Sequence, residues 1–258
     1  MTLVSHRAQF IFLKTHKTAG TSVEAALEPL CLPDGTPAGA HYRDMAVSEA
    51  GIVGARGRRA KDALWRNHMS ALAIRRQVGS RIWRRYFKIS VVRNPFDRMV
   101  SMFFSRLTVE EREELAVSFE AARTAFQVWL RTANAVRNMD KLLIGLAYQP
   151  DHVLFYERLE KDFASLARAW GISATLPRFK ADRRARPEPW ESFYDSSSRR
   201  IVEKACAFEL AFYGYSFSGG PCPGTRRERA ARLLKATPAY IATARHEPQK
   251  NSFPEVLF

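Results

Sequence analysis

A lysine and a group of small hydroxyl residues near the start of the chain have types and spacing suited to binding a phosphate or sulfate group. The lysine is Lys17, and Gly20, Thr21 and Ser22 follow it in the sequence KTAGTS. Glycine permits a tight turn, hydroxyls donate hydrogen bonds, and lysine supplies a positive charge. These residues therefore predict an anion site at a turn.

The elements on either side of this turn are expected to position it. Before it, the apolar run Phe10–Leu13 is typical of a strand buried on both faces of a parallel sheet. After it, apolar residues recur with helical spacing from Thr21 onward. The first amides of a helix have no partner inside the helix and lie at the positive end of its dipole. We therefore expect the backbone from Thr18 to Ser22 to bind the anion.

A second strand-to-helix unit places an arginine at the end of another predicted buried strand. Ile89–Val92 is apolar apart from Ser90, and Asn94 and Pro95 are residue types that favour a helix start. Arg93 lies between the strand and that start, and Ser101 falls about two turns into the predicted helix. Helix-start preferences explain Asn94 and Pro95, but they do not explain an arginine at the end of a buried strand. Like the first unit, this one places a cation between a buried strand and a helix start.

Together the two motifs resemble those of the sulfotransferases that use 3′-phosphoadenosine-5′-phosphosulfate (PAPS). KTAGTS is similar to their 5′-phosphosulfate loop, although many members have proline where this chain has His16, and RNPFDRMVS is similar to their 3′-phosphate motif. The resemblance implies that Lys17 also stabilises charge on the departing phosphate, without a metal ion. It further implies two sets of PAPS-binding residues, namely Lys17, Thr18, Ala19, Gly20, Thr21 and Ser22 at the 5′ end and Arg93 with Ser101 at the 3′-phosphate.

A histidine between the two motifs is the candidate general base. His68 stands in the sequence HMSA, which matches the family pattern H-x-[ST]-A, so the resemblance implies that it deprotonates the acceptor hydroxyl. His41 is a rival base in a weaker sequence context, and His68 could instead cap the helix predicted after it. The stretch Glu28–Arg66 is rich in Gly, Pro and Ala, and we expect it to form an acceptor-binding lid.

The resemblance covers about residues 8 to 217 and implies an α/β fold with a P-loop-like parallel sheet flanked by helices. We expect a single sulfotransferase domain over residues 1–217 and a basic C-terminal extension over residues 218–258, with one helix and an irregular tail. Helical spacing also predicts a helical region over Leu115–Leu146. In the basic loop before residue 190, Lys180 or Arg183 could contact the nucleotide.

Composition limits the alternatives. The net charge of +15 favours anionic partners, yet no helix-turn-helix, zinc-finger or RNA-recognition signature accompanies it, so no specific nucleic acid is expected. Three separated cysteines indicate neither a disulfide framework nor a zinc site. We find no signal-peptide pattern and no run of membrane-spanning length, so a cytoplasmic protein is expected.

Two other function classes stay open at this point. A P-loop kinase or NTPase would have the lysine after the second glycine, as in GxxxxGK[ST], whereas Lys17 precedes Gly20. A non-catalytic basic module binding nucleic acid or acidic polymers would use the charge alone. The favoured acceptor is a hydroxyl of a carbohydrate or glycolipid, but the sequence identifies neither the acceptor nor the oligomeric state.

Overall fold

The protein is described here by a computed structural model in two compact units, and each unit is treated by itself. The first unit comprises Met1–Arg93 and Asn138–Ala181, and the second comprises Asn94–Arg137 and Asp182–Phe258. The residues described are 2–37, 43–57, 62–132, 138–173, 175–177, 179, 186–222, 224–225, 227–228, 231–232, 234–235, 237–238 and 241.

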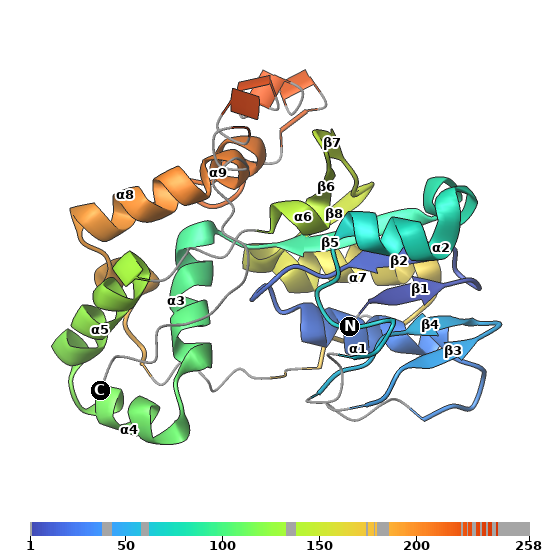
Figure 1. Ribbon diagram of the computed structural model, residues 1–258, viewed down its shortest axis with the longest axis horizontal. Helices are drawn as coiled ribbons and strands as arrows, with labels where there is room; N and C mark the ends of the chain where they lie inside the picture. The colour runs from blue at the N-terminus through green and yellow to red at the C-terminus, as the bar shows by residue number, and fades with distance from the viewer. Residues whose placement is uncertain are drawn as a thin grey trace. The chain divides into compact units, whose positions relative to one another are not determined.

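The first unit is built on a mixed sheet with strand order β3-β4-β1-β2-β5-β8 (Figure 1). Strand β5 is parallel to both of its neighbours, β2 and β8, whereas β1 pairs antiparallel with β2 and β4, and β3 pairs antiparallel with β4. The strands are β1 Leu3–Ser5, β2 Phe10–Leu13, β3 Ala46–Ser48, β4 Gly51–Val53, β5 Phe87–Val92 and β8 His152–Phe155.

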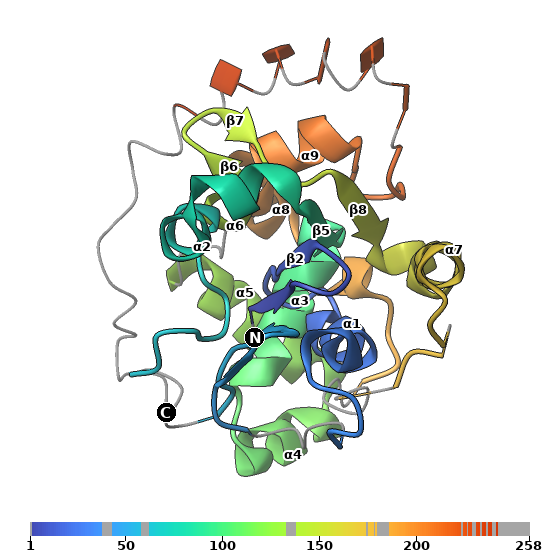
Figure 2. The ribbon, with the colours of Figure 1, turned by 90° about the vertical axis from the view of Figure 1, so that its right-hand side faces the viewer.

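Helices cover both faces of this sheet because side chains alternate along each strand. Phe10 and Phe12 of β2 pack in one apolar cluster with α1 and α7, whereas Ile11 and Leu13 pack in another with α2. Figure 2 shows α1 and α2 on opposite sides of β2. The helices and short strands of this unit are α1 Gly20–Leu27, η1 Glu28–Cys31, α2 Ala71–Arg85, α6 Met139–Leu142, β6 Leu143–Ile144, β7 Ala147–Tyr148, η3 Tyr156–Arg158 and α7 Leu159–Trp170.

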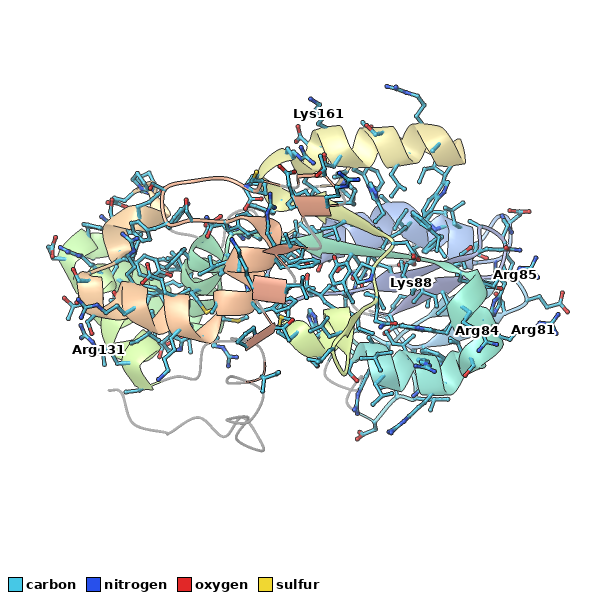
Figure 3. All side chains as sticks on the ribbon, turned by 90° about the horizontal axis from the view of Figure 1, so that it is seen from above. Arg81, Arg84, Arg85, Lys88, Arg131 and Lys161 are labelled. Carbon is cyan, nitrogen blue, oxygen red and sulfur yellow. The ribbon has the colours of Figure 1, made fainter. Side chains whose placement is uncertain are left out.

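Helix α7 has a buried side and an exposed side. On α7, Phe163 is buried against the sheet while Lys161 is exposed and points away from it (Figure 3). The helix ends at Gly171, whose φ of 65° is the left-handed conformation that glycine adopts readily. No helix in the part of the chain that the structure describes is long and apolar enough to cross a bilayer.

The second unit is helical and has an aromatic core. Phe96, Phe104, Phe126 and Phe193 are buried together there. Its helices are α3 Pro95–Arg106, α4 Val109–Val117, α5 Phe119–Thr132, η5 Trp190–Phe193, α8 Ser196–Ala205 and α9 Ala207–Tyr213. The ring edges and faces meet in T-shaped pairs, an arrangement that aromatic quadrupoles favour.

The sequence predicted the central elements well and some boundaries poorly. The predicted parallel sheet corresponds to β2, β5 and β8, and three antiparallel strands extend it. Strands β3 and β4 lie inside the predicted lid, so part of that stretch belongs to the sheet. The helical region predicted over Leu115–Leu146 is interrupted, because Ser118 has an extended backbone between α4 and α5, and β6 begins at Leu143.

Candidate active site

The turn between β2 and α1 leaves a row of backbone amides without acceptors. Lys17 and Ala19 both have left-handed backbones, with φ of 57° and 58°. Among the described residues, no acceptor is bonded to the amides of Thr18, Ala19, Gly20 or Thr21, whereas the Ser22 amide donates to the Ala19 carbonyl oxygen at 2.9 Å. Amides without partners at a helix start are suited to binding an anion, and the predicted anion site at this turn stays a prediction.

The turn carries backbone strain. Left-handed φ values are unfavourable for residues with a Cβ atom, and each such residue costs about 1–3 kcal/mol. Lys17, Ala19 and His68 are three of the four described non-glycine residues with positive φ. The strain is therefore concentrated at the residues predicted to act on a ligand.

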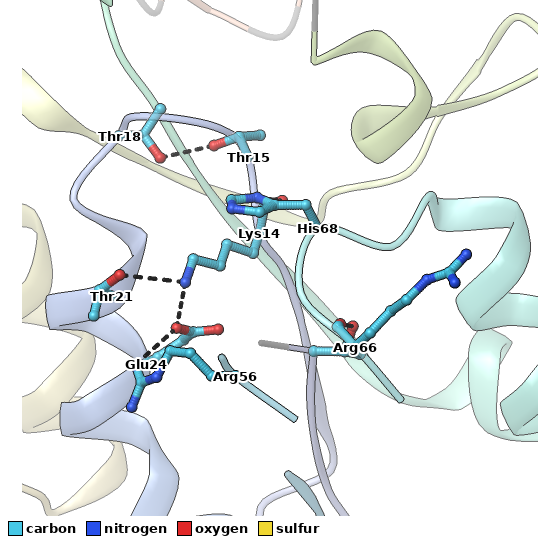
Figure 4. Close-up of polar contacts among 9 residues, drawn as sticks. Lys14, Thr15, Thr18, Thr21, Glu24, Arg56, Arg66 and His68 are labelled. Atoms are coloured by element: carbon cyan, nitrogen blue, oxygen red, sulfur yellow. Dashed lines mark hydrogen bonds and ion pairs between the residues drawn. The ribbon is translucent and has the colours of Figure 1, made fainter. Parts of the chain in front are cut away.

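Two threonines fix the turn to the neighbouring strand. The hydroxyl of Thr15 donates to the Val91 carbonyl oxygen of β5, and it lies 2.8 Å from the hydroxyl of Thr18 (Figure 4). Both threonines are buried, with side chains 1% exposed. The Thr18 side chain is thus part of the turn's support, and its predicted role in anion binding would fall to the backbone amide.

Lys14 is a buried cation beneath the turn that sequence analysis missed. Its ammonium lies 2.5 Å from Glu24 Oε2 and 3.3 Å from Thr21 Oγ1 (Figure 4). A Cβ atom on Gly20 would lie 3.1 Å from two carbons of the Lys14 side chain, so glycine makes room for that chain. Only the position of Lys14 at the strand end could have drawn attention to it.

Two buried glutamates, Glu24 of α1 and Glu28 at the start of η1, contact arginines of the predicted lid. Glu24 is 0% exposed, and its Oε2 atom also lies 3.5 Å from Arg56 Nη1, while Glu28 pairs with Arg43. Arg43 and Arg56 are themselves joined by backbone hydrogen bonds of 2.8 and 2.9 Å. Because buried charges need partners, these contacts fix the inner face of α1 and hold the turn in place.

His68 lies beside the turn in a geometry suited to a general base. Its Nδ1 atom is 3.4 Å from the Lys14 carbonyl oxygen, and a carbonyl can only accept, so Nδ1 carries the proton and Nε2 keeps its lone pair. Burial, followed by the nearby charges of His16 and Lys14, holds the pKa of His68 well below its ordinary value. A neutral imidazole with a free nitrogen can accept a proton.

Ser70, not His68, caps the helix that follows. The Ser70 hydroxyl accepts a hydrogen bond from the Ala73 amide at the start of α2. The capping role considered for His68 is therefore wrong. Instead the His68 ring stacks on His16, whose backbone amide donates to Asn138 Oδ1 at 2.8 Å. In the sequence, His16 is only a departure from the family pattern, and no signal there connects it with His68.

Arg93 reaches the turn from the end of β5. Its guanidinium donates to the Lys17 carbonyl oxygen at 3.2 Å and lies over the Tyr156 ring, 3.9 Å from the ring centroid. Stacking of this kind holds a guanidinium flat against the ring. The sequence prediction that Arg93 ends a buried strand is confirmed.

Ser101 belongs to the second unit, so its predicted pairing with Arg93 stays a prediction. It is a partly buried residue of α3, a helix that Asn94 caps by accepting from the Phe96 amide at 3.0 Å. Pro95 occupies the first turn of that helix, as predicted.

Other predicted residues have separate outcomes. The buried Ser22 hydroxyl accepts a hydrogen bond from the Phe179 amide at 3.5 Å, so it supports the chain behind the turn. His41, Lys180 and Arg183 lie outside the described residues. The described residues also contain no group of three or more metal-ligating side chains suited to an ion, and metal independence stays a prediction.

This strand–turn–helix unit is the arrangement with which α/β proteins hold phosphate or sulfate groups at a helix start. The chain belongs to the sulfotransferase family, because the family model described as "Sulfotransferase family" matches residues 1–216. The family predicted from KTAGTS and RNPFDRMVS is thereby confirmed. No curated protein and no solved structure matches the chain. Family membership supports sulfuryl transfer as the activity, with a sulfuryl donor and an acceptor substrate.

Proposed function

We propose that the protein transfers a sulfuryl group from PAPS to a hydroxyl of a carbohydrate or glycolipid acceptor. The amides of Thr18 to Thr21 hold the 5′-phosphosulfate, and Arg93 with Ser101 binds the 3′-phosphate. The residues present fit this donor, since a row of unpaired amides and several cations suit a ligand with anionic groups at both ends.

The reaction needs one proton transfer and one charge stabilisation. The acceptor oxygen attacks the sulfur atom. The new oxygen–sulfur bond forms as the bond between sulfur and the phosphate oxygen breaks, and the acceptor proton passes to His68 Nε2. Lys17 stabilises the charge that develops on the departing phosphate oxygen. Lysine, arginine and the helix dipole supply the electrostatic stabilisation that Mg²⁺ supplies in phosphoryl transfer, so the reaction requires no metal.

One observation carries the proposal: a guanidinium and a row of unpaired amides meet at Lys17. Arg93 contacts the Lys17 carbonyl oxygen at 3.2 Å, and the amides of the next four residues have no acceptor among the described residues. Arg93 therefore brings a positive charge to the turn, at the edge of the sheet where the carboxyl ends of β2 and β5 meet.

A calorimetric titration tests the donor. The protein is titrated with adenosine 3′,5′-bisphosphate, with adenosine 5′-monophosphate, and with ATP plus Mg²⁺. We expect strong preference for the bisphosphate, because the monophosphate and ATP lack a 3′-phosphate. Equal affinity for the bisphosphate and the monophosphate would overturn the donor assignment, and tight Mg²⁺-dependent ATP binding would favour a kinase or NTPase.

The sequence-based predictions of one domain over residues 1–217 and a cytoplasmic location are kept as part of this proposal. Transfer of label from radiolabelled PAPS to a panel of sugars and lipid-linked sugars tests the acceptor class. Labelling of non-carbohydrate hydroxyls alone would contradict it.

A further inference from the structure

Helix α2 is kinked at Gly79, whose backbone is not helical, and exposed arginines lie on both sides of the kink. It carries five exposed arginines, and the chain contains no acidic residue between Asp62 and Asp97. Figure 3 shows Arg81, Arg84 and Arg85 grouped at one end of the helix. We call these five side chains the α2 arginine face, namely Arg75, Arg76, Arg81, Arg84 and Arg85.

Nothing in the described part of the chain compensates this charge. None of the five arginines forms an ion pair or a side-chain hydrogen bond with another described residue, whereas exposed arginines elsewhere do, as in Arg131 with Asp195 and Arg199 with Glu203. Arginines three and four positions apart on a helix repel each other. The helix dipole offsets only the charges in the last turn. An anionic partner would remove the remaining repulsion.

Exposed apolar side chains accompany the arginines. Leu72 on α2 is 39% exposed and Phe87, two residues after the helix, is 42% exposed. Leu64 is 62% exposed, and Gln77 Nε2 donates to its carbonyl oxygen at 3.2 Å, which keeps Leu64 beside α2. Basic side chains with exposed leucine and phenylalanine are typical of surfaces that lie in a membrane interface.

We propose that the α2 arginine face, with Leu64, Leu72 and Phe87, docks the protein on the surface of an anionic lipid bilayer. Lipid phosphates attract each arginine, and the three apolar side chains enter the boundary between headgroups and acyl chains. A soluble polyanion would satisfy the arginines but would leave the apolar side chains in water. The combination of both side-chain types therefore favours a membrane over an acidic polymer.

Docking also has a consequence that rests on the proposed function. Helix α2 begins at Ala71, three residues after the candidate base His68. If the acceptor is lipid-linked, the end of α2 that carries Leu72 is the one nearest the candidate base, whereas Arg81, Arg84 and Arg85 lie at its other end. Membrane binding itself requires no turnover. The protein can therefore fail to bind membranes while the proposed reaction stands, and it can bind membranes although the proposed reaction is wrong.

Co-sedimentation with vesicles tests the proposal on the full chain, without donor or acceptor. Vesicles of phosphatidylcholine alone are compared with vesicles that also contain phosphatidylglycerol. We expect binding only to the mixed vesicles, and weaker binding at high salt because salt screens exposed charges. Failure to bind the mixed vesicles at low salt, with binding to heparin or duplex DNA, would overturn the proposal in favour of a polyanion.

A charge-matched pair of variants tests the surface itself. One variant changes the five residues of the α2 arginine face to glutamine, and the control changes five exposed basic residues on α5, α7 and α8 to glutamine, namely Arg131, Lys161, Arg168, Arg199 and Arg200. The first should bind mixed vesicles at least about tenfold more weakly and the control within about twofold of wild type. Equal losses would mean that net charge alone governs binding, and would overturn the proposal.

A third variant separates membrane from polymer. Leu64→Ser combined with Leu72→Ser should weaken vesicle binding and leave heparin binding unchanged, because only a bilayer receives the apolar side chains. Unchanged vesicle binding would show that Leu64 and Leu72 do not enter the bilayer, and would overturn that part of the proposal. Far-UV circular dichroism and urea unfolding identify any variant that fails to fold. Single substitutions at Arg81 and Arg85 then replace the arginine variant, and Leu64→Ser alone replaces the leucine variant.

Discussion

The imidazole rings of His16 and His68 are stacked, with centroids 3.9 Å apart and planes inclined by 17°. Many sulfotransferases have proline at the position of His16. Proline has no imidazole ring to stack on His68, and it lacks the backbone N–H that His16 donates to Asn138. Two rings at this distance cannot readily both be protonated, because like charges repel. His16 therefore bears directly on the protonation of the candidate base.

The first prediction concerns this stack. His16→Phe keeps an aromatic ring beside His68 but removes a positive neighbour, so the pKa of His68 should rise toward its ordinary value. NMR titration of the His68 imidazole measures this pKa directly. His152→Phe, at an exposed histidine of β8, is the matched control and should leave it unchanged. An unaltered His68 pKa in His16→Phe would show that the stack has no electrostatic effect.

A second prediction links His68 to the pH dependence of folding. Its pKa is lowered in the folded protein, whereas in the unfolded chain it returns to about 6.5. Just below that pH the unfolded state binds more protons than the folded state, so the free energy of unfolding should fall as the pH is lowered from about 6.5. Urea unfolding at a series of pH values measures this slope. The slope should flatten in His68→Gln, and an identical slope in that variant would assign it to other groups.

The third prediction concerns Lys17. Lys17→Ala should lower turnover by about a hundredfold to a thousandfold, because it removes a preorganised charge at the leaving group. Binding of adenosine 3′,5′-bisphosphate should change little, since the backbone amides stay in place. Radiolabelled transfer measures the first quantity and calorimetry the second. Lys161→Ala on the outer face of α7 is the control, and near-normal turnover in Lys17→Ala would exclude the proposed role.

A fourth prediction separates Arg93 from Ser101. A phosphate monoester carries nearly two charges at neutral pH because its second pKa is about 6. A hydrogen bond from a charged group contributes about 1.5–3 kcal/mol and a neutral one about 0.5–1.5 kcal/mol. Arg93→Ala should therefore erase most of the preference for the bisphosphate over the monophosphate, and Ser101→Ala a smaller part.

Calorimetric affinities for the two nucleotides measure this preference in each variant. Arg158→Ala is the control, since this exposed arginine follows β8 at the same end of the sheet. If Arg158→Ala reduced the preference as much as Arg93→Ala, the effect would reflect the general field of the protein and not a specific phosphate contact.

The fifth prediction concerns the buried charges under the turn. Glu24→Gln leaves the buried ammonium of Lys14 and the buried guanidinium of Arg56 without their carboxylate, so the free energy of unfolding should fall by about 3–5 kcal/mol. The exposed pair of Arg199 and Glu203 gives the matched control, and Glu203→Gln should cost less than about 1 kcal/mol. Urea unfolding measures both. Similar losses in the two variants would mean that the buried group contributes no more than a surface pair.

Local sequence determined the elements that carry the site. Three signals are contained in neighbouring residues: the apolar run Phe10–Leu13, the helical spacing after Gly20, and the helix start at Asn94 and Pro95. The structure has β2, α1 and α3 at these places. Two short motifs in the correct order were enough to indicate the family. Such features are readable because each depends on backbone preferences within a few residues.

Only the tertiary structure decided which side chains meet. Lys14, Glu24 and Arg56 are charged residues that look like surface positions in the sequence, yet they are buried together because the sheet brings three separate segments to one place. The stack of His16 on His68 likewise joins residues more than fifty positions apart. A residue's type does not state its burial or its partner, because both depend on how distant segments pack, and packing is a property of the whole fold.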